Sequence, residues 1–124
     1  MPRYFTLDEA NTTLEVIRPL VRDILETRQK LLEMQPELAP ILEKALGNGG
    51  SRLASQAAFE FSKLQELIDQ ITTTGALFKD INSGLVDFLS RRDERDVYLC
   101  WRYDEERVRY WHELDAGFAG RQPL

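Results

Sequence analysis

The sequence lacks, or contains very few of, the residues and segments that mark particular classes of protein. It contains one cysteine and one histidine among 124 residues. A single cysteine excludes an intrachain disulfide, so nothing in the sequence indicates an oxidising compartment. No apolar run approaches the ~20 residues that cross a bilayer, and Met1–Glu9 lacks the apolar core of a signal peptide. We therefore expect a soluble, cytoplasmic protein.

Charge and composition narrow the class further. Sixteen Lys and Arg residues against 21 Asp and Glu residues give a net charge of −5. This balance argues against nucleic acid and against an anionic membrane as partners. The chain is 43% hydrophobic and 30% charged, which is the composition of a folded protein and not of a disordered one. Its length fits a single domain, residues 1–124.

The N-terminal part begins with a strong helix-start signal. Thr6-Leu7-Asp8-Glu9 fits a capping box, in which Thr6 and Glu9 satisfy each other's backbone amides. From Leu7 to Leu31 apolar residues then recur in alternating steps of three and four, which predicts one long amphipathic helix. Pro19 lies inside this pattern and predicts a kink, because proline removes one helical hydrogen bond.

The rest of the helical part, up to residue 75, predicts a short helix and a second long one. Met34-Gln35-Pro36 is expected to end the first helix, Pro36–Leu46 to form the short helix, and Gly47–Gly50 to form a loop. Ser51 is expected to cap the second long helix, and Gly75 to end it. The apolar seam of that helix includes Ala57, Phe61 and Ile71. The two long helices then form an antiparallel hairpin.

Residues 76–124 change from helical spacing to alternation. Short connections between consecutive strands predict an antiparallel β-meander of three or four strands, followed by a tail, and hence an α+β fold. Arg91–Asp96 is expected to be a charged connection, with a third strand whose apolar face carries Val97, Leu99 and Trp101. Because the helical apolar stripes exceed what a small sheet covers, we expect a homodimer. The expected strands are Ala76–Ile81, Leu85–Leu89, Val97–Tyr103 and Val108–Glu113.

His112 is the first candidate for chemistry. It could act as an acid/base group or a metal ligand with a neighbouring carboxylate. In an extended segment His112 and Glu113 point to opposite faces, so Asp87 and Asp115 are the better candidate partners. No H-x-x-H or H-E-x-x-H spacing is present, so no metal is expected. If a metal does bind, His112 is the candidate ligand. The alternative is a histidine that serves only as a hydrogen-bonding or capping group.

Three further residues have both a structural and a functional interpretation. Cys100 in mid-strand is expected to be a small buried side chain, or else to face His112 across two strands as a Cys–His pair. Asp87 needs a partner if it is buried, and the candidates from the sequence include Arg102, Arg109 and Arg121. Arg121 either ties the tail to the body of the protein or binds an anion.

The sequence also resembles a known family. The segments that carry the resemblance are Tyr4–Asn11, Lys79-Asp80, Gly84–Phe88, Val97–Arg102, Tyr110–Glu113 and Asp115–Pro123. Together they resemble the prokaryotic family catalogued as domain of unknown function 2203, which brings no known activity, cofactor or catalytic residue. The resemblance implies a small soluble prokaryotic protein. It adds weight to Asp87, Trp101, His112, Asp115, Gly117, Phe118 and Arg121.

Two functions fit these observations. The first is a non-enzymatic binding or interaction module without a cofactor, whose ligand is a small anion or a protein partner. The second is a small hydrolase or metal-assisted enzyme that uses His112 with Asp87 or Asp115. The binding site of the first would lie on the polar-aromatic surface of the C-terminal sheet and tail. Its residues would be Asp87, Trp101, Arg102, Tyr110, His112, Asp115 and Arg121.

Overall fold

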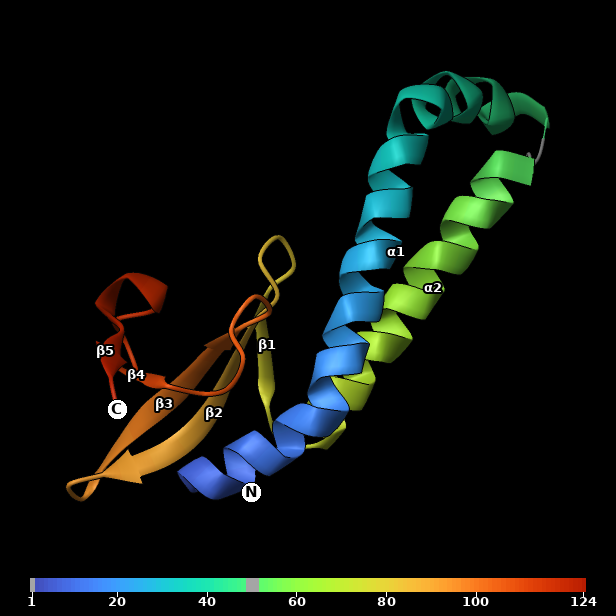
Figure 1. The fold of residues 1–124 in the computed structure, drawn as a ribbon. Coiled ribbons are helices and arrows are strands. Elements are labelled where there is room, and N and C mark those ends of the chain that lie inside the picture. Colours follow the sequence, from blue (N-terminus) through green and yellow to red (C-terminus); the bar gives the residue numbers. More distant parts are fainter. Residues whose placement is uncertain (1, 49–51) are drawn as a thin grey trace.

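The chain forms a helical hairpin with an antiparallel sheet at one end (Figure 1). A computed structural model describes residues 2–48 and 52–124, with the side chains of residues 2–36 and 52–124. The hairpin consists of α1 (Leu7–Asn48) and α2 (Arg52–Thr73). The expected α+β class is therefore confirmed.

The capping box at the start of α1 is confirmed. The Thr6 amide donates to Glu9 Oε1 at 2.9 Å, and the Glu9 amide donates to Thr6 Oγ1 at 3.1 Å. The hydrogen bond from the Thr6 amide stabilises the charged carboxylate and holds the pKa of Glu9 below its usual value. The reciprocal cap fixes where the helix begins and therefore which of its residues face the sheet.

The predicted break after Met34 is wrong. α1 continues through Pro36 and Pro40 to Asn48, so Pro36–Leu46 is its last part and not a separate helix. The ribbon of α1 turns sharply in this last third (Figure 1), which fits prolines that remove helical hydrogen bonds and bend a helix without ending it. α1 also runs through Pro19, where the kink stays a prediction. Of the expected loop Gly47–Gly50, Gly47 and Asn48 belong to α1 instead, and Gly49 and Gly50 lie outside the described residues, as does the Ser51 cap.

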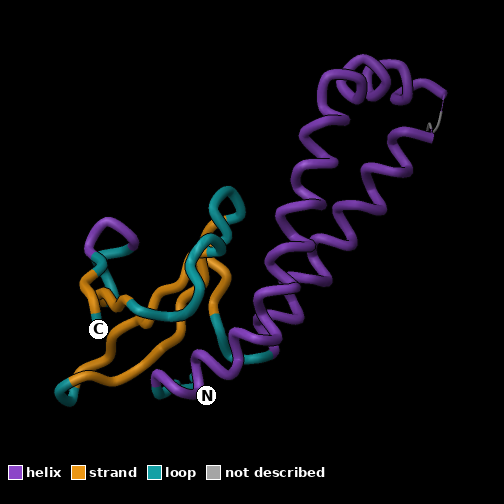
Figure 2. The backbone as a smooth tube through the Cα atoms, viewed as in Figure 1, coloured by secondary structure: helices purple, strands orange, loops and turns teal. Residues whose placement is uncertain are grey.

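The C-terminal meander has five strands, one or two more than expected. The strand order is β1-β2-β3-β4-β5, and every neighbouring pair is antiparallel. The additional strand has only two residues, too few for alternation to reveal it, and it pairs with β4 through Tyr110↔Pro123. Figure 2 shows the loops that join consecutive strands, the longest of the first three being the one between β3 and β4. The strands are β1 (Leu77–Asp80), β2 (Leu85–Arg92), β3 (Arg95–Arg102), β4 (Tyr110–Glu113) and β5 (Gln122–Pro123).

The charged connection expected over Arg91–Asp96 is mostly strand. β2 and β3 extend to the pair Arg92↔Arg95, which leaves a two-residue turn of Asp93 and Glu94. Both turn residues have positive φ, 53° and 66°, as in the tight hairpin turns whose twist matches that of the strands. The charged residues of this segment therefore belong to a hairpin, in which most of them extend β2 and β3.

The main core lies between α1 and one face of the sheet. Phe88 and Trp101 on the sheet and Leu14 and Ile17 on α1 are all fully buried in one cluster. Side chains alternate along a strand, so the residues between these core positions point to the opposite face. The members of this core on the sheet are Val86, Phe88, Val97, Leu99, Trp101 and Trp111, and those on α1 run from Ala10 through Leu14, Ile17 and Val21 to Ile24.

The seam of α2 is confirmed only in part. Ala57 and Ile71 are buried, but Phe61 is 58% exposed. The outer half of the hairpin extends past the sheet (Figure 2), where no strand covers α2. The exposed Phe61 therefore follows from the position of the sheet and not from a different helical phase.

Gly84, in the turn between β1 and β2, gives a test of the packing. Its φ is +72°, and an added Cβ would lie 2.8 Å from Val21 Cγ1 and 2.9 Å from Tyr103 Cβ. Gly117 also has positive φ, but nothing lies within 4 Å of its added Cβ. Gly117→Ala therefore adds backbone strain alone, whereas Gly84→Ala adds strain and a clash.

We expect Gly84→Ala to lower the free energy of unfolding by about 2 kcal/mol more than Gly117→Ala, as measured by urea denaturation. Equal losses would contradict this packing.

Candidate functional site

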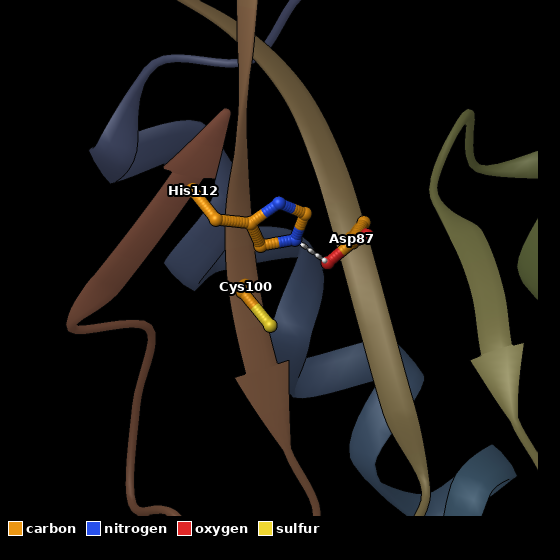
Figure 3. A group of neighbouring side chains, drawn as sticks. All are labelled: Asp87, Cys100 and His112. Carbon is orange, nitrogen blue, oxygen red and sulfur yellow. Dashed lines mark hydrogen bonds and ion pairs between the residues drawn. The ribbon is translucent and has the colours of Figure 1, made fainter. Parts of the chain in front are cut away.

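Three polar side chains from three strands meet on the sheet face opposite α1. Asp87 of β2, Cys100 of β3 and His112 of β4 point to the same side of the sheet, with α1 behind it (Figure 3). Their oxygen, sulfur and nitrogen atoms all lie within 4.8 Å of one another. The residues are 3%, 0% and 2% exposed. We call these three residues the polar cluster.

Strand register brings the polar cluster together. Asp87 lies directly opposite Cys100 in the β2–β3 pairing, and His112 lies opposite Tyr98 in the β3–β4 pairing. His112 is therefore a diagonal neighbour of Cys100, within reach of a long side chain. The Tyr98 and His112 rings are 5.6 Å apart between centroids, so Tyr98 flanks the cluster.

Both ring nitrogens of His112 are engaged. Nδ1 lies 2.7 Å from the backbone oxygen of Glu113, and because a carbonyl oxygen only accepts, Nδ1 carries the proton. Nε2 lies 3.2 Å from Asp87 Oδ1, which is hydrogen-bond distance for a proton carried by either group. The backbone contact fixes the orientation of the ring, and Nε2 then faces the other two members of the polar cluster.

The thiol of Cys100 is held in its protonated form. Burial, the negative charge of Asp87 and a hydrogen bond to that carboxylate together raise its pKa from 9.0 to about 12. Arg121 opposes this effect through its positive charge. A thiol with this pKa is not a nucleophile near neutral pH, which speaks against the Cys–His catalytic interpretation.

Arg121 ties the C-terminal tail to the sheet, as one of its two interpretations predicts. Its Nη2 donates to the backbone oxygen of Cys100 at 3.1 Å and to Glu105 Oε1 at 2.6 Å. Its guanidinium also lies over the Tyr110 ring, 4.1 Å from the centroid. Glu105 accepts a second hydrogen bond, from the Arg102 amide at 2.7 Å. These contacts hold the tail beside the polar cluster.

The arginine partners proposed for Asp87 are wrong. Arg102 forms two hydrogen bonds with Asp104, Arg109 pairs with Glu106, and Arg121 pairs with Glu105. Asp87 pairs with His112 instead. The register decides this outcome, because it places His112 near Asp87.

The remaining predicted site residues lie elsewhere. Trp101 is fully buried on the face that packs against α1, where its Nε1 donates to the Glu105 backbone oxygen at 2.9 Å. Asp115 is exposed after the end of β4 and is not part of the polar cluster. Tyr110 lies under Arg121, and Arg102 is partly exposed next to Asp104. The expected seven-residue site thus divides between two faces.

Sequence reasoning missed Glu105 and did not include Cys100 in the binding site. Alternation from the core positions Phe88, Leu99 and Trp111 already places Asp87, Cys100 and His112 on one face. The missing information was the register, which aligns them. For Glu105, which lies in a turn, the sequence carries no comparable signal.

A cavity of about 570 Å³ lies away from the polar cluster. It is lined by the segment before α1 and the far ends of β2 and β3, including Phe5, Arg91 and Val97. The polar cluster contributes nothing to its lining. The cluster is thus a packed polar centre and not the wall of this cavity.

The fold and site define a small α+β protein in which the first helix of a hairpin packs on one face of a meander and a buried Asp–Cys–His cluster lies on the other. The chain matches the family described as "Uncharacterized conserved protein (DUF2203)" over residues 3–124. It therefore belongs to this family, as the resemblance implied. Neither the search of curated proteins nor the search of solved structures found a match. Over the described part of the chain, no helix has the length and apolar character to cross a membrane.

The raised pKa of Cys100 predicts a loss of stability at high pH. The unfolded chain releases this proton near pH 9, whereas the folded chain keeps it up to about pH 12. The free energy of unfolding therefore falls as pH rises through this range, by up to about 1.4 kcal/mol per pH unit. We expect urea unfolding to show that wild type loses about 1 kcal/mol more than Cys100→Ala between pH 8 and pH 10. Parallel losses would contradict the assignment.

Proposed function

We propose that the protein is a non-enzymatic binding module, with its site on the polar-aromatic face of the sheet and tail. The observation that carries this proposal is the burial of Asp87, Cys100 and His112 on the sheet face opposite α1. Burying polar groups costs free energy that apolar side chains of similar size would not require. Retaining three of them at one point is expected of a site that holds a ligand.

The surroundings of the polar cluster fit binding better than catalysis. Cationic side chains stack on aromatic rings around it, with Lys79 over Tyr98 and Arg121 over Tyr110. The cluster residues are at most 3% exposed, so a substrate the size of an ester or a peptide has no access to them. A small ligand that fits between the three side chains is compatible with this burial.

The second candidate is a metal-assisted enzyme or hydrolase. The observation that favours it is the contact between His112 Nε2 and Asp87 Oδ1, which could position an acid/base pair. Asp115, the other carboxylate considered for this role, is not part of the cluster. This candidate requires the sheet face to open during turnover.

A ligand screen by thermal shift tests the binding module. A ligand at about 100 times its dissociation constant raises the melting temperature by on the order of 10 °C in a domain of this size. We expect at least one small anion or metal ion to do so with wild type and with Asp115→Asn, but not with His112→Ala. Absence of any such ligand would refute the module. Turnover of an ester or phosphoester that disappears in His112→Ala would favour the enzyme.

We further propose that the protein is a homodimer formed through the outer half of the hairpin. Leu31 and Leu32 of α1 and Phe61 of α2 line an apolar hollow of about 360 Å³, and Phe61 and Leu32 are 58% and 42% exposed. From the sheet part of the described chain, only Ile81, directly after β1, lines this hollow. A second hairpin would bury these side chains in a four-helix arrangement.

Sedimentation equilibrium at micromolar concentration tests the dimer, with a matched pair of variants. Phe59 and Phe61 are both exposed but lie about 200° apart around α2, because successive residues are rotated by ~100°. Only Phe61 lines the hollow. We expect wild type and Phe59→Glu to be dimers and Phe61→Glu to be a monomer. A monomeric wild type would refute the dimer, and a dimeric Phe61→Glu would refute this interface.

A further inference from the structure

The polar cluster combines the three kinds of side chain that commonly bind transition metals. It offers one imidazole nitrogen, one sulfur and one carboxylate oxygen, all within 4.8 Å of one another. Mg²⁺ and Ca²⁺ prefer sites made only of oxygen ligands, whereas Zn²⁺ binds nitrogen, sulfur and oxygen together. The chemistry of the set therefore fits a divalent transition-metal ion of the Zn²⁺ class.

The orientation of His112 is that of a metal ligand. A histidine that binds a metal through one ring nitrogen usually donates its other N–H to a carboxylate or a backbone carbonyl. Nδ1 of His112 contacts the Glu113 carbonyl at 2.7 Å, which leaves Nε2 for the ion. Nε2 faces Asp87, and the three ligand atoms lie within 4.8 Å of one another (Figure 3).

The separation of the ligand atoms also fits. Two N or O ligands at about 2.05 Å from a tetrahedral Zn²⁺ lie about 3.3 Å apart. His112 Nε2 and Asp87 Oδ1 are 3.2 Å apart. Sulfur and nitrogen ligands of the same ion lie about 3.5 Å apart, given a Zn–S distance of about 2.3 Å. The three ligand atoms lie within 4.8 Å of one another.

The polar cluster is also enclosed by the protein, because its three residues are at most 3% exposed. The apolar and aromatic side chains nearby, such as Tyr98, exclude water from the site, as around many metal ions.

We propose that Asp87, Cys100 and His112 bind one divalent transition-metal ion of the Zn²⁺ class, with a fourth position left for water or an exogenous ligand. This inference rests on the proposed binding function and names the ligand of that module. The sequence alone does not indicate the site, because the three ligands are 13 and 12 residues apart along the chain and match none of the compact spacings of zinc motifs.

Cobalt spectroscopy tests the site directly, because the chain has one cysteine and one histidine. Protein without a histidine tag is stripped with a chelator and titrated with Co²⁺. We expect one equivalent to bind, with a thiolate-to-Co²⁺ charge-transfer band in the near ultraviolet that Zn²⁺ abolishes by displacement. Such a band can arise only from Cys100, so the wild-type protein alone tests the proposal without depending on the folding of any variant.

Variants then assign the other ligands. Cys100→Ser should lose the charge-transfer band, and His112→Gln and Asp87→Asn should weaken Co²⁺ binding by at least roughly 10-fold, the lower end of the effect of changing outer-shell groups. Asp115→Asn, which changes an exposed carboxylate outside the cluster, should bind like wild type. Circular dichroism establishes that each protein is folded.

The outcomes separate this inference from the binding module. Folded wild-type protein that shows no charge-transfer band and retains no Zn²⁺ after dialysis overturns the metal site. Co²⁺ binding that Asp115→Asn weakens as much as Asp87→Asn also overturns it, because surface carboxylates would then be the ligands. If the metal site fails but the thermal-shift screen finds a different ligand that requires His112, the binding module stands with that ligand instead.

Discussion

The packing of the first half of α1 against β2 and β3 is the constraint on which the rest of the structure depends. Leu14, Ile17 and Val21 can be buried only against one face of the sheet, and they select the face that carries Phe88 and Trp101. Because strand side chains alternate, Asp87 and Cys100 must then point away from the helix. The site is thus a consequence of which face the helix covers, and the hydrophobic core positions a polar cluster that it does not contain.

A hairpin turn and the hydrogen bonds of Arg121 keep the sheet face that carries the polar cluster ordered. The turn of Asp93 and Glu94 fixes the register of β2 and β3, which places Asp87 opposite Cys100. Arg121 bridges the Cys100 carbonyl and Glu105, which fastens the tail next to β3. Charge-assisted hydrogen bonds of this kind are stronger than neutral ones and fix geometry. The cluster is therefore held from both the strand side and the tail side.

The sheet end and the outer half of the hairpin differ in the side chains that they bury and expose. The sheet end carries the buried polar cluster, while the outer half of the hairpin carries exposed apolar residues such as Phe61 (Figure 1). Buried polar groups often stabilise a fold less than apolar side chains of similar volume would. Exposed apolar side chains on an uncovered helix face lower solubility unless something packs on them. Both features would be explained if this protein binds a ligand at the sheet end and a second copy of itself at the outer half of the hairpin.

The sequence by itself determined the local structure and the alternation. The capping box of Thr6 and Glu9, the buried stripe of α1 from Ala10 to Ile24 and the helix stop at Gly75 follow from contacts between residues close along the chain, and so does the inward position of Leu99 and Trp101. Only the tertiary structure decided the partners of Asp87, the position of Glu105 and the exposure of Phe61. The physical reason is that these depend on strand register and on where one layer ends above another. Both are set by packing between segments far apart in sequence, for which local spacing carries no signal.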